Sequence, residues 1–184
     1  MRIALFGGSF NPPHVAHQLA CAYVLATARP PVDEVWMVPT WKHPFDKQLV
    51  PFADRLAMCE RSIAPFGGRV ALSRIEEELG GDSYTLETVK ALRARFPEHS
   101  FALVIGADLV EERVRWHGWP ELQTLIEFII VGRGGYPHEA ASELILPTVS
   151  STEVRDRLAR GDSVASLVPA DVVDYIRAHH LYGT

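Results

Sequence analysis

The sequence predicts an α/β protein with a doubly wound, Rossmann-like parallel sheet that carries helices on both faces. Short apolar runs typical of buried strands alternate along the chain with longer segments whose apolar residues have helical spacing. The run at 100–105 is almost entirely apolar, which is typical of a central strand covered on both sides. With 184 residues, no internal repeat and no long linker, the chain is expected to form one domain over residues 1–184.

The predicted elements follow one another in strand–helix order. Strands are expected at 2–6, 34–38, 70–73, 100–105, 128–131 and 143–146, and helices at about 15–28, 51–64, 85–96, from 150 onward and at about 169–179. In the first helix, apolar residues recur at spacings of three to four, at Val15, Leu19, Tyr23 and Ala26.

Two charged stretches are interpreted as surface. In the helix at 51–64, the residues from Asp54 to Arg61 are expected to supply the charged face. The acidic run at 76–78 is interpreted as solvated, as most such runs are, and is given no chemical role.

Composition limits the classes of partner. Hydrophobic residues make up 47% of the chain, which is enough for a core, and the net charge of −5 argues against non-specific nucleic-acid binding. Cys21 and Cys59 lie in apolar helical patterns and are expected to be buried free thiols. Because the first residues enter a strand directly and no apolar run reaches membrane-spanning length, a soluble cytoplasmic protein without membrane or nucleic-acid partners is expected.

The stretch at 7–17, GGSFNPPHVAH, lies where the first strand gives way to the first helix. Its glycines allow a tight turn and a close ligand approach, and the free N–H groups and positive dipole end of the helix favour an anion. His14 and His17 are three residues apart on one helix face, where their imidazoles can donate to phosphate oxygens. Plain surface histidines are the alternative, and a metal-binding pair is a weaker one.

A second anion site is predicted at the helix that begins near residue 150. Ser150 and Glu153 have the spacing of a capping box. Ser151, Thr152 and Arg155 fall on adjoining faces of the first turn, where hydroxyls, amides and a guanidinium form a phosphate cradle. The alternative is a capped surface helix with an incidental arginine.

Other candidate residues follow the carboxyl ends of predicted strands, where parallel sheets bind ligands. Asp108, placed to accept bonds from ribose hydroxyls, is alternatively a helix cap, and Arg133 ends the strand at 128–131. In the loop at 40–51, Lys42 and Lys47 are two candidates for contacting a phosphate. The alternative is that both side chains are solvated.

Two further segments have an ordinary structural interpretation. Ser83 or Thr85 has the residue type of a helix N-cap. Tryptophans more often belong to a core, and this applies to Trp116 and to the nearby Trp119, its competitor for a ligand-stacking role. The charged neighbours of Trp116 suggest that it lies on a half-exposed face.

Several reaction classes lack their signatures. The sequence contains neither a GxxxxGK[ST] phosphate loop nor a GxGxxG fingerprint, which argues against a P-loop ATPase and a dinucleotide oxidoreductase. No serine or cysteine is set with a base at a recognised spacing for covalent catalysis.

The stretch at 7–17 resembles the GG(S/T)FDPxHxGH signature of bacterial nicotinate-nucleotide adenylyltransferases, which belong to the HxGH nucleotidyltransferases. S-Y-T at 83–85, I-G-x-D at 105–108, V-x-R-x-G-Y-P at 131–137 and S-S-T-x-x-R at 150–155 follow in the family's order. Two departures stand in the signature, Asn11 where the family has Asp and Ala16 where it has Gly.

The resemblance implies adenylyl transfer from ATP to nicotinate mononucleotide, which gives deamido-NAD and pyrophosphate in NAD biosynthesis, with Mg²⁺ accompanying ATP. It implies these roles: catalytic, His14 and His17; ATP-binding, Gly7, Gly8, Ser9, Phe10, Gly106, Asp108, Arg133, Ser150, Ser151, Thr152 and Arg155; substrate-binding, Lys47, Ser83, Tyr84, Thr85 and Trp116. No metal ligand is assigned to the protein, and a homo-oligomer is possible. The alternatives are nicotinamide mononucleotide or phosphopantetheine as acceptor, a non-catalytic nucleotide-binding module, and a Rossmann-type redox protein.

Overall fold

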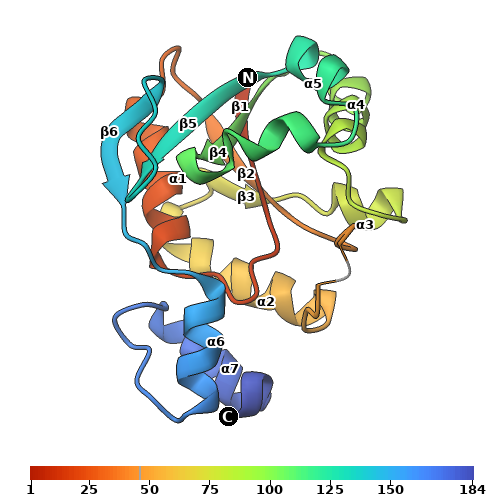
Figure 1. Ribbon diagram of the computed structural model, residues 1–184. Coiled ribbons are helices and arrows are strands. Elements are labelled where there is room, and N and C mark those ends of the chain that lie inside the picture. Colours follow the sequence, from red (N-terminus) through yellow and green to blue (C-terminus); the bar gives the residue numbers. More distant parts are fainter. Residues whose placement is uncertain (46) are drawn as a thin grey trace.

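The computed structural model describes residues 1–45 and 47–184, and within them one parallel sheet of six strands in the order β3-β2-β1-β4-β5-β6 (Figure 1). The strands are β1 (Arg2–Gly8), β2 (Glu34–Pro39), β3 (Val70–Leu72), β4 (Ser100–Gly106), β5 (Glu127–Arg133) and β6 (Ala141–Leu146). Every pairing between neighbours is parallel. The chain runs outward from β1 to β3 and then returns to β4, so the predicted doubly wound sheet is confirmed and its order reverses between β1 and β4.

Helices cover both faces of this sheet. They are α1 (Val15–Thr27), α2 (Phe52–Ile63), α3 (Ile75–Leu79), α4 (Thr85–Arg95), α5 (Trp119–Leu125), α6 (Ser151–Ala159) and α7 (Ala170–Ala178). Ala4 of β1 packs in one cluster with residues of α1 and α2, whereas its neighbours Ile3 and Leu5 pack in another with residues of α3, α4 and α5. Alternate residues of one strand thus point into two cores, which explains why the strands are apolar throughout.

The two C-terminal helices form a third cluster. Val154 and Leu158 of α6 and Val172 and Ile176 of α7 pack with Met58 of α2. Figure 1 shows α6 and α7 beyond α2, at the far end of the molecule from the N-terminus. α2 therefore has one side in the core on the α1 face of the sheet, through Cys59, and another against the C-terminal helices.

The expected helix α1 forms, but the residues whose spacing predicted it are not the ones that it buries. The residues against the sheet are Ala16, Ala20, Cys21 and Val24, while Leu19 is 44% exposed. Small side chains at these positions let the helix axis approach the sheet closely, so the largest apolar residues do not mark the inner face. Cys21 and Cys59 are buried free thiols as predicted, and burial raises the pKa of the Cys21 thiol to about 12.

The turn after β1 also differs from the expectation. β1 extends through Gly7 and Gly8, and neither glycine has a positive φ. The left-handed position is Phe10, with φ of 45°, and the Asn11–Pro12 peptide bond is cis. Gly8 is needed because a Cβ there would lie 3.0 Å from the Phe10 ring.

Among the described residues, no helix is long and apolar enough to cross a membrane.

Candidate active site

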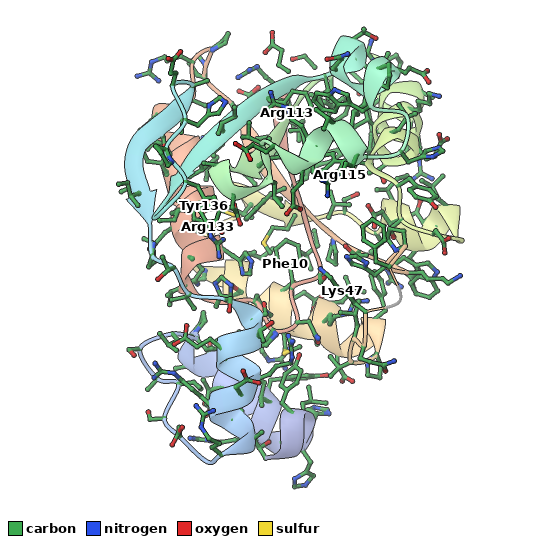
Figure 2. The ribbon with its side chains drawn as sticks, in the orientation of Figure 1. Phe10, Lys47, Arg113, Arg115, Arg133 and Tyr136 are labelled. Atoms are coloured by element: carbon green, nitrogen blue, oxygen red, sulfur yellow. The ribbon has the colours of Figure 1, made fainter. Side chains whose placement is uncertain are left out.

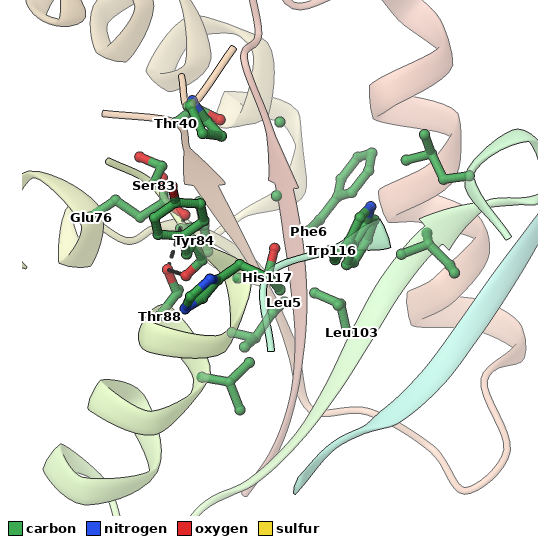
Figure 3. A pocket seen from close by; sticks show the side chains of 18 of the residues that line it. Leu5, Phe6, Thr40, Glu76, Ser83, Tyr84, Thr88, Leu103, Trp116 and His117 are labelled. Atoms are coloured by element: carbon green, nitrogen blue, oxygen red, sulfur yellow. Dashed lines mark hydrogen bonds between the residues drawn. The ribbon is translucent and has the colours of Figure 1, made fainter. Parts of the chain in front are cut away.

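A cavity of about 480 Å³ opens at the carboxyl ends of β1 and β4, where the strand order reverses. One wall consists of residues at the ends of these strands, Phe6, Gly7, Gly8 and Gly106 among them. Figure 3 shows Ser83, Tyr84, Trp116 and His117 around the same cavity, contributed by the segments before α4 and α5. In open α/β sheets this crevice is the usual ligand site.

His14 and His17 form a stacked pair beside this crevice. Their ring centroids are 3.7 Å apart, and Nδ1 of His17 accepts the backbone N–H of His14 at 3.0 Å. Burial and the charge of Arg133 lower the pKa of His14 to about 4, and burial, His14 and Arg133 hold the pKa of His17 well below 6.5. Both imidazoles are therefore neutral at pH 7. Because Nδ1 of His17 is an acceptor, its proton is on Nε2, which is a hydrogen-bond donor.

The expectation that free amides at the start of α1 bind an anion is wrong for most of that turn. The N–H of His14 goes to His17, that of Val15 to the Leu167 carbonyl at 2.9 Å, and that of His17 to the His14 carbonyl at 2.9 Å. These amides already have acceptors within the protein. What α1 offers to an anion is the imidazole N–H of His17.

Side chains from α2 and α6 hold the turn at 9–12 by its carbonyl oxygens. Arg55 donates to the Ser9 carbonyl at 3.1 Å, Arg155 to the Asn11 carbonyl at 2.8 Å, and Ser151 to the Pro12 carbonyl at 2.8 Å. The structure thus brings the start of α6 against the turn that leads to His14, and the two predicted anion sites lie side by side.

The remaining residues of this group have defined places. Ser150 is the N-cap of α6 and accepts the Glu153 N–H at 3.1 Å. The Glu153 carboxylate pairs with Arg157 at 2.8 Å, so the capping box predicted for α6 is present only in its Ser150 half. Thr152 accepts a bond from Arg155 at 3.2 Å. The Phe10 ring is 1% exposed and lies edge-on to His17 at 5.0 Å between centroids, where it supports the imidazole rather than facing a ligand.

Asp108 and Arg133 meet at the ends of β4 and β5. The carboxylate of Asp108 lies 3.4 Å from Nε of Arg133. Asp108 does not cap the 3₁₀ turn η2 (Ala107–Leu109), since Gly106 holds the N-cap position, so the capping alternative fails. A Cβ at Gly106 would lie 2.3 Å from Oδ1 of Asp108, so glycine is required for the carboxylate to fold back over the strand end. Figure 2 shows Arg133 beside Tyr136, near the start of α1.

The predicted base-binding residues line the cavity, with one exception. Ser83, Tyr84, Thr85 and Trp116 are among its lining residues, and Lys47 is not. Trp119, the competitor of Trp116, instead packs against Phe128 at 5.4 Å between ring centroids.

The helix-cap interpretation of this segment is wrong. Tyr84, not Ser83 or Thr85, is the N-cap of α4. The Ser83 hydroxyl accepts the N–H groups of Trp41 and Lys42 at 3.0 and 3.2 Å, so it fastens the segment after β2 to the cavity wall. Lys42 forms an ion pair with Asp82 at 2.8 Å.

Two charged residues of this region, one buried and one half-buried, were assigned to the surface on sequence. Arg55 is 1% exposed and donates to the carbonyls of Ser9, Val50 and Trp41. Glu76 lines the cavity, and its carboxylate accepts the Trp41 N–H at 3.2 Å and the Thr88 hydroxyl at 3.0 Å. Burial raises the pKa of Glu76 above its ordinary value. Each residue belongs to a charged stretch of the sequence, and only the position of Glu76 beside the buried Ile75 hinted at its orientation.

A doubly wound parallel sheet with a cavity at its switch point, and the start of α6 held against the turn that leads to α1, define an α/β protein of the nucleotide-binding type. The cytidylyltransferase-like family model matches residues 5–157. The chain therefore belongs to the cytidylyltransferase-like family and, by its relatives, to the nicotinate-nucleotide adenylyltransferases within it.

These relatives match along nearly their whole length. A probable nicotinate-nucleotide adenylyltransferase of Anaeromyxobacter dehalogenans (strain 2CP-C) is 47% identical over 183 residues, covering 98% of this chain and 96% of the relative. One of Myxococcus xanthus is 43% identical, covering 100% and 95%. The fold is similar to that of Plasmodium falciparum nicotinic acid mononucleotide adenylyltransferase complexed with NaAD, with a TM-score of 0.84, 22% identity and coverage of 98% and 97%.

Proposed function

We propose that this protein transfers the adenylyl group of ATP to nicotinate mononucleotide, giving deamido-NAD and pyrophosphate as a step of NAD biosynthesis. The observation that carries the proposal is that Ser151 and Arg155 of α6 hold the turn that leads to His14 and His17, so the start of α6 lies beside the histidine pair. Hydroxyls, a guanidinium and imidazoles gathered in this way fit a ligand with several phosphates. The similarity to probable nicotinate-nucleotide adenylyltransferases supports the same activity.

The reaction is a direct displacement at phosphorus. An oxygen of the mononucleotide phosphate attacks the α-phosphorus of ATP, a new P–O bond forms, and the bond to the bridging oxygen breaks with its electron pair leaving on pyrophosphate. Such chemistry needs positioning and charge stabilisation rather than a covalent intermediate. Nε2–H of His17 donates to an α-phosphate oxygen, and because the imidazole is neutral and fixed through Nδ1, it does not have to reorient.

The other roles follow from the residues beside the histidine pair and from those that line the cavity. Ser151, Thr152 and Arg155 at the start of α6 face the β- and γ-phosphates; because the Ser151 hydroxyl already donates to Pro12, the donors are the Thr152 hydroxyl and the remaining N–H groups of Arg155. Asp108 accepts from the ribose of ATP beside Arg133. Trp116 stacks on the pyridine ring, with Tyr84 and Thr85 alongside it. Lys47 is exposed outside the cavity lining, so its contact with substrate requires movement of the loop.

Mg²⁺ enters this reaction as part of its substrate, Mg-ATP. In the described part of the chain, no three His, Cys, Asp or Glu side chains gather closely enough to hold a metal ion. The donor set at α6 consists of hydroxyls and a guanidinium, which suits phosphate oxygens and not a cation. The ion is therefore held by phosphate oxygens and water, where it neutralises charge on the leaving pyrophosphate.

The test is His17→Ala, assayed for pyrophosphate release from Mg-ATP with nicotinate mononucleotide. We expect turnover to fall by at least about a hundredfold while the protein stays folded, since a preorganised donor to the transition state is lost. A variant with wild-type turnover would contradict the role of His17.

Three further predictions belong to the proposal: one domain over 1–184, a cytoplasmic location and possible self-association, the last measurable by light scattering.

A further inference from the structure

Tyr182, which follows the last helix, contacts the turn at 9–12. It lies in the 3₁₀ turn η4 (Leu181–Gly183), and its hydroxyl donates to Oδ1 of Asn11 at 2.8 Å, across 171 positions of the chain. Tyr182 has φ of 61° and His180 φ of 50°. Positive φ values are strained for such residues and persist where the surrounding structure over-determines them.

Asn11 is the acceptor at the centre of this contact. It is 2% exposed, and besides Tyr182 its Oδ1 accepts the Val50 N–H at 3.3 Å, while Nδ2 donates to the Gln48 carbonyl at 3.4 Å. One amide side chain therefore joins the turn, the segment before α2 and the C-terminus. It directly follows Phe10, the other strained position, and its own carbonyl is held by Arg155.

We infer that Tyr182 is a positioning residue for the reaction, and that it acts through Asn11. The hydrogen bond fixes the Asn11 side chain, and with it the turn that sets where His14 and His17 point. This inference rests on the proposed function and extends the site to residues outside the family match at 5–157. Burial raises the pKa of the Tyr182 phenol, so the hydroxyl stays protonated and remains a donor across the working pH range.

The chain offers a matched control. Tyr175 of α7 donates its hydroxyl to the Asp54 carboxylate at 2.8 Å, a bond that ties the same C-terminal region to α2 and does not end at the turn. Tyr182→Phe and Tyr175→Phe each remove one hydroxyl hydrogen bond of equal length. They differ in whether the lost bond ends at Asn11.

The experiment compares thermal midpoints, steady-state kinetics and ATP affinity for these two variants and wild type. We expect similar small decreases in melting temperature for both, with kcat about five- to tenfold lower only in Tyr182→Phe, and the KM for nicotinate mononucleotide within about twofold in both. Asn11→Ala should reproduce the kcat loss, and combining it with Tyr182→Phe should add little further loss because both changes break the same contact.

Wild-type kcat in folded Tyr182→Phe, or a loss equal to that of Tyr175→Phe, would overturn the inference. Should Tyr182→Phe not fold, Asn11→Ala alone decides, since full activity in that variant also overturns it. If wild type shows no adenylyl transfer, the proposed function fails by itself. The positioning role of the bond between Tyr182 and Asn11 is then tested by Mg-ATP affinity, which we expect to weaken about fivefold in Tyr182→Phe and not in Tyr175→Phe.

Discussion

Replacing Glu76 tests whether a carboxylate in the cavity acts by positioning the wall that receives the pyridine nucleotide. Its oxygens hold the Trp41 N–H at 3.2 Å and the Thr88 hydroxyl at 3.0 Å. On the other side of the same peptide segment, the Trp41 carbonyl accepts from Arg55 at 3.4 Å. Figure 3 shows Glu76 beside Ser83 and Thr88, with the hydrogen bonds of Thr88 to Glu76 and Tyr84 as dashed lines.

The loss of folding stability in Glu76→Ala depends on which hydrogen-bond acceptor each donor keeps. In Glu76→Ala, the Trp41 N–H retains the Ser83 hydroxyl at 3.0 Å and the Thr88 hydroxyl retains the Tyr84 carbonyl at 3.3 Å, while the Ser83 hydroxyl loses the carboxylate that it also bonds. The bonds lost by these three donors, at about 1 kcal/mol each and offset by release of a half-buried carboxylate, give about 1–2 kcal/mol. For a chain of this length that lowers the melting temperature by about 2–8 °C.

The kinetic effect should fall on one substrate. The loosened wall belongs to the Ser83 side of the cavity, so the KM for nicotinate mononucleotide should rise about tenfold while the KM for ATP stays within about twofold. Glu76→Gln is the matched variant: its amide oxygen can accept from Trp41 and its NH₂ can donate to the Thr88 oxygen. We expect it to restore a near-normal KM. If Glu76→Gln is as impaired as Glu76→Ala, the negative charge itself is required and the positioning argument is wrong.

Three other predictions follow from the site. Acidification from pH 7 to pH 4 should lower the free energy of unfolding by about 3 kcal/mol through His14 alone, because its folded pKa of about 4 lies below the unfolded 6.5 and the unfolded chain binds the extra proton; denaturant titrations should show a loss smaller by about that amount in His14→Asn, with His17 still contributing in the same direction, and an equal loss in both proteins would contradict it. Gly106→Ala should raise the KM for ATP about tenfold with folding intact, since a Cβ 2.3 Å from Oδ1 displaces Asp108; an unchanged KM would remove Asp108 from the ribose site. Arg55→Met should destabilise the protein by about 3 kcal/mol or more, measured by chemical denaturation, because three backbone carbonyls lose a buried donor.

The parts of the fold that local pattern determines were predictable. Apolar runs located the sheet strands. In α4 the helical spacing of Leu86, Val89 and Leu92 is enough to identify the inner face, and all three are buried. The face of α1 was not predictable in this way, because small residues such as Ala16 and Ala20 carry little hydrophobic signal yet decide how closely a helix packs.

The site was predictable where a motif is contiguous and not where it depends on long-range contacts. The stretch at 7–17 and the start of α6 can be recognised by residue type. Arg55 and Glu76 have the sequence context of surface charges, but the fold buries Arg55 and places Glu76 in the lining of the cavity. The bond between Tyr182 and Asn11 joins residues 171 positions apart, and no local spacing encodes it. Hydrogen-bond partners of buried charges are set by tertiary packing, which a linear pattern does not contain.

The most direct test of the proposed activity measures pyrophosphate release from Mg-ATP by the purified protein, with nicotinate mononucleotide, nicotinamide mononucleotide and phosphopantetheine as parallel acceptors. We expect rapid release with nicotinate mononucleotide, slower release with its amide, and none with phosphopantetheine. Preference for another acceptor would contradict the assigned substrate while keeping the chemistry. No release with any of the three, from folded protein that binds ATP, would contradict the assignment as an adenylyltransferase and favour a nucleotide-binding module.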